Sequence, residues 1–244
     1  MRSRFFVRAH LVMLVVVVLG FAPSSILRGV IPQPPVLDIP RLPTLFLVHG
    51  TLLLAWYLFL VMQARWIQQR SVARHRTAGW VGAGLAVAVL GSTVAIVRNF
   101  PGRMATLATE RNTTIDALEP SLAGILWLDI VMCMLFVTFV SGGILARRRA
   151  QVHKRLMFFA GVTFLFAATA RLGSLAAIIT TPALQPLVHF GILLGLTLSL
   201  PVHDRRTLGR VHPATWTCFA AYWGGSVLSV LLAGSPMGDW VLTW

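Results

Sequence analysis

The sequence predicts an all-α, polytopic membrane protein, a bundle of seven transmembrane helices. Of its 244 residues, 57% are hydrophobic and only 11% are charged, and the mean hydropathy is +0.78. These values lie outside the usual range of soluble globular domains. A helix needs about 20 mostly apolar residues to cross a bilayer, and seven such segments use nearly the whole chain. We therefore expect one transmembrane domain over residues 1–244.

Short polar or proline-rich connections separate the expected spans, which lie at about 5–21, 42–66, 78–97, 122–146, 156–180, 184–200 and 214–233. The stretch 31–43 is too rich in proline to be helical throughout. Small residues such as Gly82, Gly84 and Gly91 in the third span allow a neighbouring helix to approach closely. The longest hydrophilic stretch, 98–120, is interpreted as a lid, a partner surface or a plain solvated connector.

The basic residues give the orientation. Clusters at 2–8, 65–76, 147–155 and 205–210 all fall on the same side of the predicted bundle, whereas the connections on the other side hold as many acidic as basic side chains. The positive-inside rule places the basic side in the cytoplasm, so the N-terminus is cytoplasmic and the C-terminus is outside. The net charge of +14 then reflects topology and contact with anionic headgroups at the cytoplasmic face, and nucleic-acid binding is not expected. The expected location is a bacterial cytoplasmic (inner) membrane.

Motifs with a specific chemistry are missing from the sequence. It has no HExxH, Walker A, GxSxG or CxxCH motif, which makes several enzyme classes improbable and leaves open whether the chain is an enzyme. Cys133 and Cys218 fall in different spans and form no CxxC, so neither a disulfide framework nor a thiolate zinc site is indicated.

One regularity concerns histidines. The basic connections after the second, fourth and sixth spans each place a histidine at the start of the next span, namely His75, His153 and His212. About one helix length upstream of each, the preceding span carries a polar residue in its outer half, namely His49, Asp129 and His189. This pattern favours three related helical hairpins after a lone first helix.

An outer set of ionisable residues is the first candidate site. His49, Asp129, Arg171 and His189 all fall in the outer half of their spans, and ionisable groups inside a bilayer indicate function by default. One interpretation is a buried ion pair between Asp129 and Arg171. The other makes His49 and His189 the axial ligands of a b-type haem, or the ligands of a transition metal together with Asp129, while Arg171 holds a propionate or a substrate anion.

An inner set is the second candidate site. His203 lies on the same helical face as His189, and it would join His75, His153 and His212 near the cytoplasmic surface. Haem at both depths would let electrons cross the bilayer. The alternative is that these histidines, which neighbour Arg and Lys, simply meet water and phosphate headgroups.

Two resemblances bear on these sets. Paired histidines at two depths resemble, in outline, the b-type transmembrane cytochromes of the cytochrome b561 kind. A closer resemblance, to an uncharacterised family of bacterial multi-pass membrane proteins, covers the second to fifth spans. Its residues here are His49, Gln63, Arg70, His75-Arg76 and Gly79, and then His153-Lys154-Arg155 and Arg171. The resemblance implies the topology and the choice of residues, and it names no reaction.

Three functional hypotheses follow. The first is a redox centre, haem b or a transition metal, bound through His49 and His189 and also through His75 and His153, for electron transfer or membrane-bound oxidation. The second is a proton-coupled transporter of a small molecule, with Asp129, Arg171 and the outer histidines as a titratable pathway. The third is a non-catalytic subunit or assembly factor of a larger membrane complex that docks a partner through 98–120.

Overall fold

The computed structural model describes residues 4–26, 43–115 and 122–241, which form helices joined by short turns. Within these ranges, seven helical segments are long and apolar enough to cross a membrane. This confirms the predicted all-α polytopic fold. The elements are α1 (Phe5–Ile26), α2 (Thr44–Gln68), α3 (Val72–Glu110), α5 (Leu122–Leu145), α6 (Ala150–Val162), η1 (Thr163–Leu165), α7 (Phe166–Ile179), α8 (Leu184–Leu208), α9 (Pro213–Ala233) and α10 (Pro236–Val241).

Three helices are longer than the sequence predicted at the end where the basic clusters lie, and α3 is one of them, since it begins at Val72 instead of near 78. The segment α6–η1–α7 forms one span, Ala150–Ile179, which begins six residues before the expected start at 156. Helix α8 continues to Leu208 instead of ending near 200. His153 and His203 therefore lie within helices, which fixes the direction of their side chains.

Helix α3 differs most from expectation, because it continues through Pro101 to Glu110. Residues 98–110 are therefore helical and not an irregular connector. Met104 and Leu107 in this extension are buried with Leu126 of α5, so the extension has an apolar face that packs within the protein. Residues 116–120 of the predicted partner surface lie outside the described residues, and docking through 98–120 stays a prediction.

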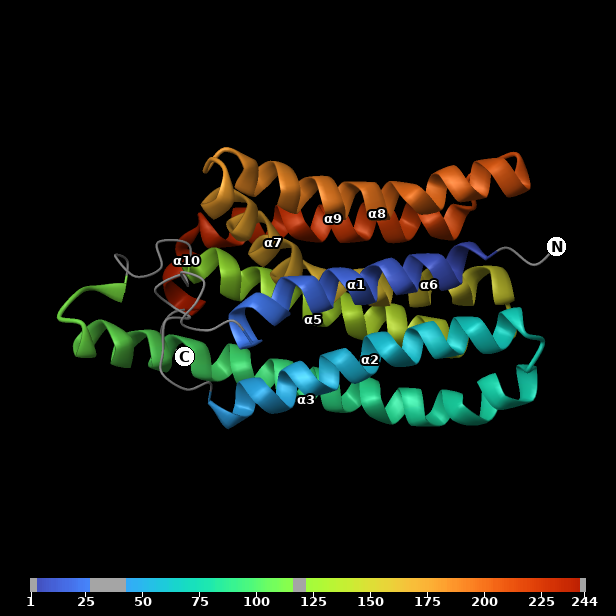
Figure 1. Ribbon diagram of the computed structural model, residues 1–244, viewed down its shortest axis with the longest axis horizontal. Helices are drawn as coiled ribbons and strands as arrows, with labels where there is room; N and C mark the ends of the chain where they lie inside the picture. The colour runs from blue at the N-terminus through green and yellow to red at the C-terminus, as the bar shows by residue number, and fades with distance from the viewer. Residues whose placement is uncertain (1–3, 27–42, 116–121, 242–244) are drawn as a thin grey trace.

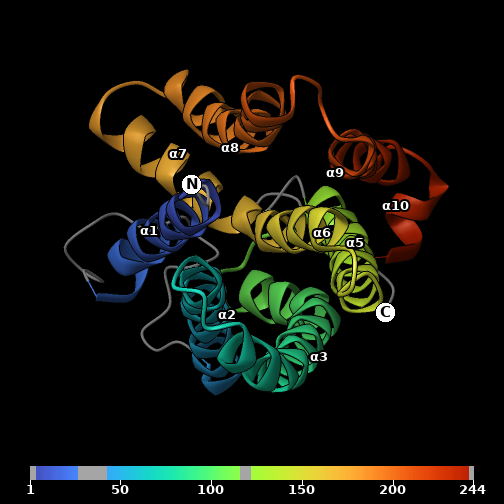
Figure 2. The ribbon, with the colours of Figure 1, turned by 90° about the vertical axis from the view of Figure 1, so that its right-hand side faces the viewer.

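The helices run along one long axis (Figure 1). Helices α2, α5 and α8 end, and α3, α6 and α9 begin, at the same end of the bundle, which we call the basic end because the clusters 65–76, 147–155 and 205–210 lie there. Seen along the axis, α2 and α3 lie on one side of α1, and α7 and α8 lie on its other side (Figure 2). Helix α6 occupies the middle, next to α5.

Close helix packing at glycine occurs at one of the three predicted positions. A methyl group on Gly82 would overlap the ring of Phe59 on α2, so this glycine allows α2 and α3 to approach. Gly84 and Gly91 face open space, since a methyl group there would have no neighbour within 4 Å. Large apolar side chains such as Val87 and Val230 are exposed on the outside of the bundle, as expected for a surface in lipid.

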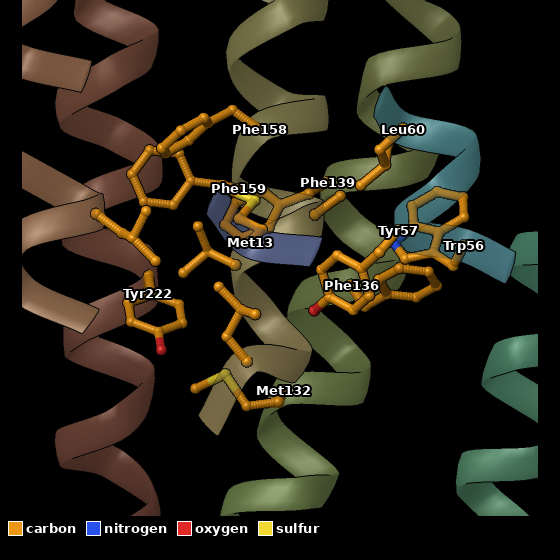
Figure 3. Close-up of a cluster of buried hydrophobic side chains, with 14 of the residues drawn as sticks. Met13, Trp56, Tyr57, Leu60, Met132, Phe136, Phe139, Phe158, Phe159 and Tyr222 are labelled. Carbon is orange, nitrogen blue, oxygen red and sulfur yellow. The ribbon is translucent and has the colours of Figure 1, made fainter. Parts of the chain in front are cut away.

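Aromatic side chains fill the centre of the bundle (Figure 3). Phe136 on α5 meets Trp56 on α2 edge-to-face at 5.3 Å between ring centroids, and it contacts Phe164 at 4.7 Å. Phe159 lies against Tyr222 of α9 at 6.4 Å. Because lipid is as apolar as these side chains, close packing rather than exclusion from water holds the helices together here.

Phe136→Ala tests this core. The substitution removes a ring that is 1% exposed and that joins three helical segments, so we expect a loss of about 3 kcal/mol in the free energy of unfolding. Titration with denaturing detergent, followed by circular dichroism, measures this loss in unfolding free energy. Val137→Ala, at a neighbouring position with 44% exposure, should change stability by less than about 0.5 kcal/mol. Equal losses at the two positions would contradict the packing described.

Candidate functional site

His49 is bound within the α2–α3 pair. Its Nδ1 lies 3.0 Å from the hydroxyl oxygen of Ser92 on α3. The Ser92 hydroxyl donates its own hydrogen to the carbonyl of Val89, at 2.8 Å. A serine has only one hydroxyl hydrogen, so His49 donates from Nδ1 and its Nε2 keeps the lone pair.

His189 is bound in the same manner within the α7–α8 pair. Its Nδ1 lies 2.9 Å from the hydroxyl oxygen of Thr169, and that hydroxyl donates to the carbonyls of Leu165 and Phe166. His189 therefore donates from Nδ1, and its buried Nε2 has no hydrogen-bond partner.

The structure does not bring His49 and His189 together. Their hydrogen bonds tie them to helix pairs on opposite sides of α1 (Figure 2). Across the described residues, no group of three or more His, Cys, Asp or Glu side chains could hold a metal ion. The expected metal set of His49, Asp129 and His189 is therefore not assembled, because equal depth in the membrane does not make two helices neighbours.

Asp129 and Arg171 are neighbours without being paired. Each lies within electrostatic range of the other, and His49 is within range of Arg171. Arg171 donates from Nη1 to the carbonyl of Ala167 at 3.1 Å, and its guanidinium stacks on the ring of Phe21 at 4.4 Å. Its buried Nε has no hydrogen-bond partner, and no oxygen of Asp129 lies within ion-pair distance. We call His49, Asp129 and Arg171 the outer cluster.

His75 and His153 do come together at the basic end. Their ring centroids are 6.0 Å apart and the rings are nearly perpendicular, at 84°. His153 Nδ1 lies 2.8 Å from the carbonyl oxygen of Gly143 on α5. A carbonyl can only accept a hydrogen bond, so Nδ1 of His153 carries the proton and Nε2 keeps its lone pair.

Gln63 on α2 is the third member of this group. Its backbone interacts with the His75 ring. The Gln63 side chain is only 8% exposed, and neither its amide oxygen nor its amide nitrogen has a hydrogen-bond partner. Nδ1 of His75 is likewise buried without a partner. Unsatisfied buried polar groups cost about 1–3 kcal/mol each. We call Gln63, His75 and His153 the inner cluster.

The other two inner histidines serve packing and capping. His203 stacks on Phe5 of α1 with centroids 4.2 Å apart and an interplanar angle of 2°. His212 caps α9, because its Nδ1 accepts a hydrogen bond from the Ala214 amide at 3.1 Å. Burial, and after it the charge of Arg155, lower the pKa of His212, which keeps the accepting neutral form. Neither ring lies in the inner cluster, although the sequence grouped them with it.

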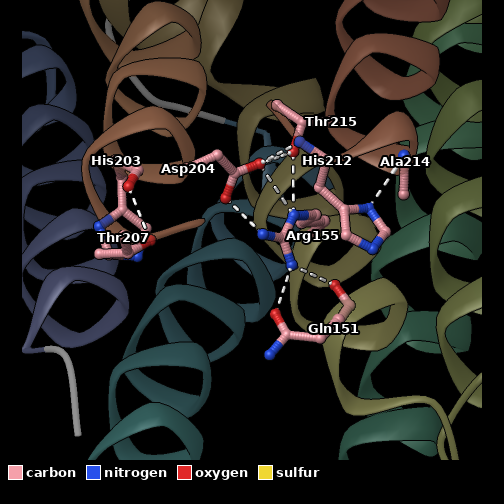
Figure 4. A network of polar contacts seen from close by, with 8 residues as sticks. All are labelled: Gln151, Arg155, His203, Asp204, Thr207, His212, Ala214 and Thr215. Carbon is pink, nitrogen blue, oxygen red and sulfur yellow. Dashed lines mark hydrogen bonds and ion pairs between the residues drawn. The ribbon is translucent and has the colours of Figure 1, made fainter. Parts of the chain in front are cut away.

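A buried ion pair at the basic end was missed by sequence reasoning (Figure 4). Arg155 of α6 and Asp204 of α8 are 1% and 0% exposed and form two hydrogen bonds, from Nη2 and, at 3.1 Å, from Nε. Thr215 and the backbone amide of His212 also donate to Asp204, and Gln151 accepts twice from Arg155 Nη1. The available signal was that Asp204 is the single acidic residue in the basic connections.

Comparison with known proteins adds no constraint on function. We found no family model, curated protein or solved structure that matches the chain. The resemblances drawn from the sequence therefore stay predictions, and the geometry of the two clusters supports the functional proposal.

The Arg155–Asp204 pair predicts strong coupling between two substitutions. Asp204→Leu leaves the Arg155 charge buried without compensation, so we expect a loss of about 3–5 kcal/mol in unfolding free energy. The double variant Arg155→Met/Asp204→Leu should be clearly more stable than Asp204→Leu alone. Detergent unfolding gives the unfolding free energy of wild type, Arg155→Met, Asp204→Leu and the double variant, with the exposed neighbour Arg205→Ala as the control. Simple additivity of the two single losses would contradict the pair's role.

Proposed function

We propose that this protein is a multi-pass protein of the bacterial cytoplasmic membrane that holds a redox-active transition-metal centre between His75 and His153. The centre is a metal ion or the iron of a b-type haem, and its role is electron transfer or membrane-bound oxidation. The observation that supports the proposal most is the approach of these two imidazoles, 6.0 Å apart, on α3 and α6.

The separation of the rings suits a shared metal. A metal–imidazole nitrogen bond is about 2.0–2.1 Å, so two rings that bind one metal have centroids about 5–6 Å apart. The hydrogen bond from His153 Nδ1 to the Gly143 carbonyl resembles the outer hydrogen bond by which metal-binding histidines are usually oriented. Nε2 of His153 then provides the ligand lone pair, and the unpaired amide oxygen of Gln63 is a further donor for the same group.

The position of the inner cluster suggests the direction of electron exchange. It lies at the basic end, which the positive-inside rule places at the cytoplasmic face. The arginines of 147–149 neighbour it in sequence and favour anionic headgroups or an anionic redox partner. We infer that the centre exchanges electrons with a partner on the cytoplasmic side.

Optical spectra and elemental analysis of the detergent-purified protein test the proposal. We expect either a Soret band or about one equivalent of iron, copper or another transition metal per chain. His75→Ala and His153→Ala should each lower that content at least tenfold, because each removes one of two ligands. His203→Phe is the matched control, since it keeps an aromatic ring against Phe5. A wild-type protein with neither haem nor stoichiometric metal would sink the proposal.

The open outer cluster favours a second candidate, a proton-coupled carrier of a small anion. Charged groups inside a bilayer are normally paired, yet Asp129 and Arg171 lie within electrostatic range without an ion pair. Arg171 then provides a positive charge for a substrate carboxylate or phosphate. Asp129 and the Nε2 lone pair of His49 are sites that accept a proton.

Flux measurements in liposomes separate this candidate from the first. Asp129→Asn keeps the shape of the side chain and removes its charge, so proton-coupled uptake of anions should be abolished while the bound metal remains unchanged. Glu110→Gln, an exposed acidic position at the end of α3, should transport as wild type does. Equal fluxes with wild type and Asp129→Asn would exclude a carrier role for the outer cluster.

A further inference from the structure

Two donor atoms on α1 face the interior, an imidazole nitrogen and a thioether sulfur. His10 and Met13 lie three residues apart, on the same face of the helix. Both are buried, with exposed fractions of 4% and 0%. Neither residue stands out in the sequence, because His10 follows a basic N-terminal segment and Met13 lies in an apolar span.

Both donor atoms converge on Gly161 of α6. A methyl group at position 161 would lie 3.0 Å from the Met13 sulfur and 3.7 Å from Nδ1 of His10. Because position 161 is a glycine, no side chain of its own separates the two atoms. The Tyr57 hydroxyl donates a hydrogen bond of 2.9 Å to the Gly161 carbonyl, which ties this part of α6 to α2.

The His10 imidazole has an unused donor position. Its Nδ1 is fully buried and has no hydrogen-bond partner among the described residues. The walls around it are apolar, since Leu60 also borders the position of the Gly161 methyl and the Phe158 ring lies 6.4 Å from the imidazole. An unpaired imidazole nitrogen in such surroundings is costly unless it binds a ligand.

We propose that His10 and Met13 bind Cu(I). A thioether sulfur is a soft ligand that selects Cu(I), and imidazole also suits copper. Harder ions such as Mg²⁺ or Ca²⁺ require several oxygen ligands, which these apolar walls do not offer. The single positive charge of Cu(I) also costs less to bury than a divalent charge does. This site is independent of the centre proposed between His75 and His153.

Anaerobic titration of the detergent-solubilised protein with Cu(I), in competition with a chromogenic Cu(I) chelator, tests the proposal. Wild type should retain one equivalent that His10→Leu and Met13→Leu each bind at least tenfold more weakly. Gly161→Ala should also weaken binding, because its methyl group would lie 3.0 Å from the Met13 sulfur and crowd it. Met132→Leu, which replaces another buried methionine of the same core, is the matched control and should bind as wild type does.

Two further measurements make the result decisive. The double variant His75→Ala/His153→Ala should keep this equivalent, so failure of the inner centre and failure of the Cu(I) site are distinguishable. X-ray absorption at the copper edge of the wild-type protein, loaded with one equivalent, should show both sulfur and nitrogen ligands, and this does not depend on any variant folding. Copper without a sulfur ligand, or unchanged affinity in both His10→Leu and Met13→Leu, would overturn the proposal.

Discussion

The buried ion pair between Arg155 and Asp204 fixes the basic end of the bundle. It joins α6 to α8 directly and reaches α9 through Thr215. A buried ion pair is stable only with good geometry and additional hydrogen bonds, and here every side-chain nitrogen of Arg155 and both oxygens of Asp204 have a partner. His153 lies two residues before Arg155, so the ion pair anchors the same segment of α6 that carries this imidazole.

The buried polar groups are of two kinds, those that have hydrogen-bond or ion-pair partners and those that have none. The charges of Arg155 and Asp204 compensate each other, so we assign this pair a structural role. It lies among α6, α8 and α9. Asp129 and Arg171 remain apart, and the Gln63 amide has no partner at all. Natural proteins seldom leave buried polar groups unpaired unless a ligand or a function requires it, so the functional positions are expected among these residues.

Hydropathy and charge predicted the spans from sequence, because both depend only on local composition. The candidate sites depend on which helices are neighbours, and periodicity gives only a residue's depth and face. His49 and His189 matched in depth, but α1 lies between their helix pairs. His75 and His153 were grouped correctly because both begin a helix after a basic connection. His10 was not selected from the sequence, because its burial and its approach to Gly161 of α6 depend on how α1 packs in the bundle.

The span α6–η1–α7 contributes one residue to the inner cluster, one to the surroundings of His10 and Met13, and one to the outer cluster. His153, Gly161 and Arg171 follow one another along α6–η1–α7, at intervals of about 12 Å and 15 Å by the rise of a helix. A 3₁₀ turn at Thr163–Leu165 lies between the last two. A 3₁₀ turn rotates the following side chains relative to an unbroken α-helix, so Arg171 does not keep the α-helical relation to Gly161. Arg171 stacks on Phe21 of α1 within electrostatic range of Asp129, and Gly161 approaches Met13 of α1. The turn thus lies between α6, which contributes to both proposed metal sites, and α7, which contributes Arg171 to the outer cluster.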